Sequence, residues 1–195
     1  MEKVLEKLRK LDPDKIEPNI LKTTLNTIDF AQVDYCSYLN DESFENYSRV
    51  FLMESPLRVF LNIWPSQHQL PVHQHNNFWG YIAVLKGLLT ETSFVFEEEE
   101  SKLSCHPPKN FRKGEVIFEP LNGIHHIQNP SPSKPLVTAH FYYPSIMSYD
   151  GVRIFDIKKK KMAWMNEKAP GVSWKHPKDY YSRIERNAFT VVNLW

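Results

Sequence analysis

The sequence has little cysteine, no long apolar run and no excess of one charge. Only Cys36 and Cys105 occur among 195 residues, which excludes a disulfide framework and favours a reducing, cytoplasmic setting. The charged start MEKVLEKLRK lacks the apolar region of a signal peptide, and no segment reaches the roughly eighteen apolar residues of a membrane span. The formal net charge of +1 gives no reason to expect nucleic acid or an anionic membrane as partner.

The N-terminal segment, residues 1–44, has the apolar spacing of helices. Val4, Leu5, Leu8 and Leu11 recur at helical intervals before Pro13, and this predicts a first helix. A second apolar stripe covers 20–28, and 31–39 is compatible with a third short helix. We therefore expect N-terminal α-helices.

From Tyr47 the apolar period changes to two. Six segments predict strands, at 48–53, 57–64, 80–87, 90–97, 114–119 and 135–143, and turn signals separate them. Short strands in this number indicate a barrel or sandwich. The length suits one domain spanning 1–195, with a mainly β barrel at 45–145 and strands in 146–195 that cover one end of it.

Three histidines carry the main chemical signal. His73 and His75 are two apart, so on a strand their side chains leave the same face. His125 follows in a later segment with glycines and a proline. Three imidazoles that converge from different strands can hold a divalent transition metal and leave positions open for substrate and oxygen. The alternative is three unrelated histidines on polar strand faces.

The two histidine segments resemble the two motifs of the cupin superfamily. His73, His75 and Gly87 match the first motif, but Trp79 and Gly80 stand where that motif has a glutamate. The segment GEVIFEPLNGIHHIQN matches the second motif, with His125 as its ligand. The resemblance implies a double-stranded β-helix (jelly-roll) fold. Without the glutamate, three neutral imidazoles would leave a dicationic metal that an anionic substrate can approach.

A cupin without that glutamate is similar to the thiol dioxygenases, and the cysteine dioxygenase family is the closest resemblance. It implies ferrous iron, Fe(II), on His73, His75 and His125. It also implies an outer hydrogen-bonded triad, here Thr138, His140 and Tyr142, with threonine in place of the family's serine. Period-two geometry places these three side chains on one strand face.

The resemblance also implies a substrate anchor in Tyr47-Ser48-Arg49. A guanidinium can hold a carboxylate by two parallel hydrogen bonds, so Tyr47 and Arg49 are the predicted substrate-binding residues. Arg58, on the next predicted strand, is the competing candidate. Gly80 lies where animal members have a cysteine cross-linked to the triad tyrosine, so no such cross-link is possible here.

The predicted activity is iron-dependent oxidation of cysteine or a related small mercapto acid by O2 to the sulfinic acid. The choice between cysteine and 3-mercaptopropionate stays open, as does the choice between a monomer and a small homo-oligomer. Two other functions also stay open: another three-histidine cupin dioxygenase, such as a carbon–carbon cleaving enzyme, and a non-catalytic cupin that binds a small ligand.

Overall fold

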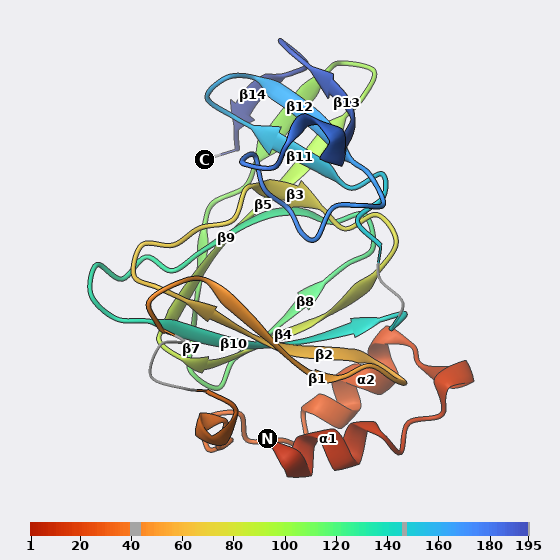
Figure 1. Cartoon of the computed structure of the whole chain (residues 1–195), viewed down its shortest axis with the longest axis vertical. Helices are drawn as coiled ribbons and strands as arrows, with labels where there is room; N and C mark the ends of the chain where they lie inside the picture. Colours follow the sequence, from red (N-terminus) through yellow and green to blue (C-terminus); the bar gives the residue numbers. More distant parts are fainter. Residues whose placement is uncertain (40–43, 146–147, 195) are drawn as a thin grey trace.

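The chain folds into two curled β-sheets that face each other, with helices on one side (Figure 1). This computed structural model describes residues 1–39, 44–145 and 148–194. Residues 40–43 of the predicted helical segment, and residues 146–147 and 195 of the predicted C-terminal segment, lie outside the described residues. The fold is mainly β, of the cupin (double-stranded β-helix) class, as the sequence predicts.

Two N-terminal helices are confirmed, and the third is wrong. Helix α1 covers Glu2–Leu8 and α2 covers Pro18–Leu25, with a 3₁₀ turn at Pro13–Lys15. Within 31–39 the only helical structure is a 3₁₀ turn at Cys36–Tyr38. The side chains of Asp29 and Asp34 accept hydrogen bonds from the backbone N–H groups two residues on. Such local bonds satisfy the backbone in a turn and so compete with a helix.

Strands form at all six predicted segments. The five-stranded sheet has the order β1 (Ser48–Met53), β2 (Arg58–Trp64), β10 (Leu136–Tyr143), β4 (Trp79–Lys86), β8 (Val116–Glu119). The larger sheet has the order β13 (Tyr181–Glu185), β12 (Lys161–Met165), β11 (Arg153–Asp156), β3 (Val72–Gln74), β9 (Ile124–Gln128), β5 (Leu88–Glu97), β6 (Lys102–Cys105), β14 (Thr190–Asn193), with β7 (Lys109–Arg112) paired to β5.

The C-terminal part adds strands to the larger sheet. β11 pairs with β3, and β12 and β13 continue the sheet away from the helices (Figure 1). β14 joins the other edge, parallel to β6. A 3₁₀ turn at Lys178–Tyr180 precedes β13. Among the described residues, no helix has the length and apolar character needed to cross a bilayer.

Strands β2 and β10 are buried on both faces. On one face Leu61 and Phe141 pack in the same apolar cluster as Leu21 and Leu25 of α2. On the other face β2 presents Phe60, Asn62 and Trp64, and β10 presents Thr138, His140 and Tyr142. Because successive side chains alternate across a strand, packing the helices against one face fixes which side chains face the barrel interior.

Candidate metal centre

The three predicted ligands converge inside the barrel. His73 on β3 lies directly opposite His125 on β9 in the antiparallel register, and their Nε2 atoms are 3.3 Å apart. His75 completes a group whose ligand atoms all lie within 4.8 Å of one another. Nitrogens bound about 2.1 Å from one metal ion lie roughly 3 to 3.4 Å apart. The donor set therefore fits a single transition-metal ion, and imidazole suits iron among others.

Two of the ligand rings are held in the neutral form. Nδ1 of His73 is 2.9 Å from the carbonyl oxygen of Pro71, an acceptor only, so Nδ1 carries the proton and the Nε2 lone pair faces the other imidazoles. Burial and the neighbouring His125 hold the pKa of His73 and of His75 well below the usual value. Neutral imidazole is the ligating form.

His125 has an acidic environment behind it. Its Nδ1 lies 2.7 Å from Oε2 of Glu119 and 3.0 Å from Oε1 of Glu91. Burial alone would lower the pKa of His125, but these two carboxylates outweigh it and raise the pKa to about 10. Burial also raises the pKa of Glu119 to about 7, against the opposing effect of His125.

The next histidine along β9 points the other way, as the sequence predicts. His126 lies on the outer face, where its Nε2 is 3.1 Å from Oε1 of Gln69. Gln74, between the first two ligands, also points outward and accepts a hydrogen bond of 2.7 Å from Arg153. Strand alternation thus separates ligands from their sequence neighbours.

The predicted triad is an unbroken hydrogen-bonded chain. Oγ1 of Thr138 lies 2.8 Å from Nε2 of His140, and Nδ1 of His140 lies 3.0 Å from the hydroxyl of Tyr142. Burial, and then the charge of Arg49, hold the pKa of His140 well below the usual value. Burial raises the pKa of Tyr142 well above its usual value, so the phenol keeps its proton.

Neighbouring side chains determine which atoms donate and which accept in the hydrogen bonds of this triad. The Nε of Arg49 donates to Oδ1 of Asn62 at 3.2 Å. That bond orients the amide, so Nδ2 of Asn62 donates to Nε2 of His140 at 3.1 Å. Nε2 of His140 is therefore the acceptor, and Nδ1–H donates to Tyr142. The hydroxyl proton of Tyr142 is left free to point at the metal pocket.

Arg49 lies in the barrel interior with neutral partners. Its Nη1 donates to the hydroxyl of Tyr149 at 2.9 Å, and its guanidinium carbon lies 4.3 Å from the centre of the Phe60 ring. In the part of the chain that the structure describes, no carboxylate forms an ion pair with Arg49. Arg49 is partly buried. Taking a cation out of water without an anion is costly, so this guanidinium is available for an anionic ligand.

Comparison with known proteins decides the family. The sequence profile described as Cysteine dioxygenase type I matches residues 36–158. The chain belongs to the cysteine dioxygenase type I family. It is 27% identical over 97 residues to cysteine dioxygenase type 1 of Homo sapiens, covering 48% of this chain and 46% of that protein. It is 24% identical over 135 residues to that of Danio rerio, covering 65% and 58%. The chain thus spans about half the length of the curated relatives it matches.

Two solved structures have a similar arrangement. One is a conserved protein with a double-stranded β-helix domain from Klebsiella pneumoniae, with TM-score 0.45, 14% identity and coverage of 64% of this chain and 96% of that chain. The other is a cupin sugar phosphate isomerase from Silicibacter pomeroyi, with TM-score 0.47, 11% identity and coverage of 78% and 83%.

Within the cysteine dioxygenase fold, Gly80 marks a close approach of two strands. It lies opposite Tyr142 in the pairing of β4 with β10. A β-carbon at position 80 would collide with the carbonyl oxygen of Phe141 and the ring of Tyr142. The backbone therefore lets Tyr142 lie directly against β4.

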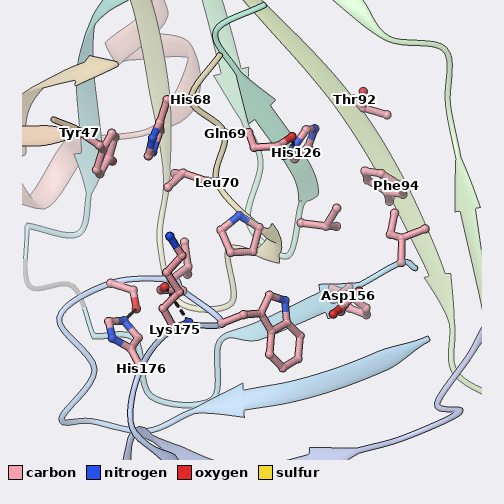
Figure 2. Close-up of a pocket in the computed structure, with 18 of the residues that line it drawn as sticks. Tyr47, His68, Gln69, Leu70, Thr92, Phe94, His126, Asp156, Lys175 and His176 are labelled. Carbon is pink, nitrogen blue, oxygen red and sulfur yellow. Dashed lines mark hydrogen bonds between the residues drawn. The ribbon is translucent and has the colours of Figure 1, made fainter. Parts of the chain in front are cut away.

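The metal pocket opens beside a much wider groove. The pocket has a volume of about 30 Å³, and among the described residues that line it none is acidic. The groove has a volume of about 1100 Å³, and Arg49, Leu70 and Val172 line both. Figure 2 shows the groove with Tyr47 beside His68 at one end and Phe94 at the other. The groove gives solvent a route to Arg49.

The predicted substrate residues occupy different places. Arg49 lines the metal pocket, whereas Tyr47 lines only the groove, stacked on His68 with ring centres 4.7 Å apart. Arg58 lies over the Phe51 ring, 4.7 Å from its centre, and lines neither cavity. The structure thus brings Arg49, and not Arg58, to the three histidines.

Sequence reasoning missed four residues of this site, namely Asn62, Glu91, Glu119 and Tyr149. Asn62 had a signal, because it is the single polar residue inside the apolar run VFLNIW. Tyr149 had none, since it reaches Arg49 from the segment after β10. The two glutamates lie on strands recognised from their apolar residues, and only the sheet pairing places them behind His125.

Proposed function

We propose that this protein is an iron-dependent thiol dioxygenase that converts cysteine, or a related small mercapto acid, to its sulfinic acid. The reaction joins one thiol and one O2, RSH + O2 → RSO2H. Both oxygen atoms end on sulfur, and the sulfur supplies all four electrons. No other reductant is needed, in keeping with a site built from three ligands and one substrate anchor.

One observation carries the proposal: a partly buried guanidinium without an ion-pair partner among the described residues faces the same small pocket as three converging imidazoles. Arg49 has only neutral partners, and the pocket has no acidic side chain among its described lining residues. A thiolate that also carries a carboxylate would place one negative charge at the metal and the other at Arg49. A neutral substrate would leave the Arg49 charge uncompensated.

The protein's own residues orient the reactants. His73, His75 and His125 would hold Fe(II), which supplies the redox chemistry that lets O2 react with a thiolate. Arg49 fixes the substrate carboxylate. Tyr142 presents its hydroxyl proton to the pocket, and its ring lies 5.5 Å, centre to centre, from that of His75.

The other members of the proposed site support these groups. His140 holds the hydroxyl of Tyr142 and Thr138 holds His140, each through one bond. Tyr47 packs on the Trp64 ring, with ring centres 5.1 Å apart, at the groove side of Arg49. We propose that it borders the route by which the substrate enters.

The deciding experiment measures oxygen uptake and product together. Iron-loaded protein is mixed with cysteine, 3-mercaptopropionate or cysteamine, and O2 consumption is compared with sulfinate formed. We expect one sulfinate per O2 for a thiol carboxylic acid and little turnover of cysteamine. The Tyr143→Phe variant, altered outside both cavities, should match the parent. Oxygen uptake without sulfinate, or uptake only with a dicarbonyl substrate, would reject the proposal.

We extend the proposal to the setting of the protein. Cys36 and Cys105 are both free thiols, as expected in the reducing cytoplasm. A monomer or a small homo-oligomer is expected, and light scattering of the iron-loaded protein would measure it.

A further inference from the structure

A buried carboxylate lies behind two of the three ligand histidines. Oε2 of Glu119 is 2.7 Å from Nδ1 of His125 and 4.0 Å from Nδ1 of His75. The residue is 3% exposed, so water does not compete for it. It lies on β8, directly opposite Gly80 of β4, so the neighbouring strand brings no side chain into this space.

Two polar atoms at this place have no partner among the described residues. They are Oε1 of Glu119 and Nδ1 of His75, both fully buried. A buried polar atom without a hydrogen bond is costly. When Nε2 of His75 binds a metal, its Nδ1 must carry the ring proton, because a neutral imidazole has one N–H. That N–H then needs an acceptor, and Glu119 is the carboxylate that faces it.

Glu91 provides an internal comparison. Its Oε1 lies 3.0 Å from Nδ1 of His125 and accepts the hydrogen bond from that ring. Its side chain is 14% exposed. Glu91 already accepts a hydrogen bond from His125. The carboxylate of Glu119 can therefore turn toward His75 while Nδ1 of His125 keeps an acceptor. The two glutamates therefore differ in reach, since Glu91 reaches one ligand and Glu119 lies between two.

We infer that Glu119 is a positioning residue whose single carboxylate holds the outer nitrogens of both His75 and His125 in the metal-loaded protein. It fixes the angle between the two rings and adds a second negative charge, beside that of Glu91, behind the ligand histidines. The inference rests on the metal site of the proposed function, but not on thiol oxidation. An anion this close stabilises the higher charge of the metal, so it lowers the Fe(III)/Fe(II) reduction potential.

The first test is NMR of the protein loaded with Zn(II), which is diamagnetic and needs neither thiol nor O2. Slowly exchanging ring N–H protons are observed for His75 and His125 in ¹⁵N-histidine-labelled protein. We expect both signals to move in Glu119→Gln and only that of His125 to move in Glu91→Gln. If the parent shows a protected Nδ1–H on His125 alone, or if Glu119→Gln leaves the His75 signal unchanged, the inference is overturned.

The second test measures metal affinity and potential. Glu119→Gln keeps the size and removes the charge, so Co(II) binding to the metal-free protein should weaken about 10- to 100-fold. The Fe(III)/Fe(II) potential should rise. Glu119→Asp, which keeps the charge, should recover part of both. Glu115→Gln is the matched control, since Glu115 is exposed and directly precedes β8. Unchanged affinity and potential in Glu119→Gln would reject the role.

These readouts separate the two proposals. A protein that binds Co(II), Zn(II) and iron as described but oxidises no thiol would reject the proposed function and leave the role of Glu119 intact. A protein that oxidises cysteine with an unchanged potential in Glu119→Gln would do the reverse. Should Glu119→Gln fail to fold, the parent's two ring N–H signals and the Glu119→Asp variant still decide the question.

Discussion

Asn62 donates its side-chain N–H to Nε2 of His140 across 3.1 Å. Its carbonyl oxygen accepts from Arg49 at 3.2 Å, so one amide joins the proposed substrate anchor to the hydrogen-bonded chain of Thr138, His140 and Tyr142. Only one orientation of the amide satisfies both neighbours, because Arg49 can only donate. The tautomer of His140, and with it the free proton of Tyr142, depends on this residue.

Asn62→Asp should change the protonation of His140. A carboxylate accepts but does not donate, so it would draw a proton onto Nε2 of His140 and raise the pKa of this histidine. We expect His140 to become protonated nearer neutral pH and the turnover rate to fall. NMR titration of the histidine rings measures the first effect, and oxygen uptake measures the second. Asn110→Asp, on β7 and outside both cavities, is the control. An unmoved His140 pKa would contradict the argument.

Tyr142→Phe should keep iron and still bind thiol, but react more slowly. Misplaced reactants can cost on the order of a hundredfold in rate, and the variant removes the hydroxyl that faces the pocket. The measurement is steady-state kinetics with metal analysis. Tyr143→Phe is matched to it, because the hydroxyl of Tyr143 bonds to the carbonyl of Pro13 outside the site. Equal rates for the two variants would remove Tyr142 from the mechanism.

Arg49→Lys should raise the KM for thiol carboxylic acids and leave the iron content unchanged. The lysine keeps the charge but loses the fork that binds a carboxylate at two points. Loss of a charge-assisted pair in a desolvated site costs on the order of 2–5 kcal/mol, which is an upper range here since the charge remains. Arg58→Lys is the control. If Arg58→Lys has the larger effect, the anchor has been assigned to the wrong arginine.

His125→Ala should abolish iron retention. The variant has only two of the three imidazole ligands, and it also loses the ring that Glu91 and Glu119 contact. Metal analysis of protein from iron-rich medium gives the answer, with His126→Ala as the adjacent control. Full iron in His125→Ala would refute the ligand assignment.

The metal-free protein should lose stability in mild acid. The pKa values of His73, His75 and His140 are lowered by burial in the fold, so below about pH 6.5 the unfolded chain binds more protons. The free energy of unfolding should then fall by up to ~1.4 kcal/mol per pH unit for each group. His125 acts in the opposite sense, because its pKa is raised to about 10 and its contribution is lost as the pH rises toward that value.

Urea unfolding of metal-free protein at about pH 7.5 and about pH 5.5 checks this expectation. His140→Gln should show a shallower dependence, since one of the three groups is gone. Equal stability at both pH values would mean that the lowered pKa values of His73, His75 and His140 do not outweigh the opposing effects of His125 and Glu119.

Much of the geometry of the candidate site could be predicted because strand alternation is a local rule. His73 with His75, and Thr138 with His140 and Tyr142, are each read from a single strand whose period is two. The two helices were predicted for the same reason, from apolar spacing. The third helix failed because Asp29 and Asp34 bond to nearby backbone, and apolar spacing does not report such bonds.

The residues that were missed depend on contacts distant in sequence. Tyr149 meets Arg49 across 100 positions of the chain. Glu91 and Glu119 meet His125 only after β5, β8 and β9 have taken their places in two different sheets. No local sequence pattern predicts these contacts, because a glutamate or tyrosine at the same position on a solvent-exposed strand would have the same sequence neighbours.

Strands β2 and β10 are buried on both faces, so the packing of the N-terminal helices affects how the pocket residues are positioned. The residues of these strands that point away from the pocket pack in the same apolar cluster as Leu21 and Leu25 of α2. Leu61 and Leu21 do not line the pocket. A substitution at either would nevertheless shift β2 and β10, the strands that carry Asn62 and His140. Substitutions in the helices can therefore change the shape of the pocket without altering any residue that lines it.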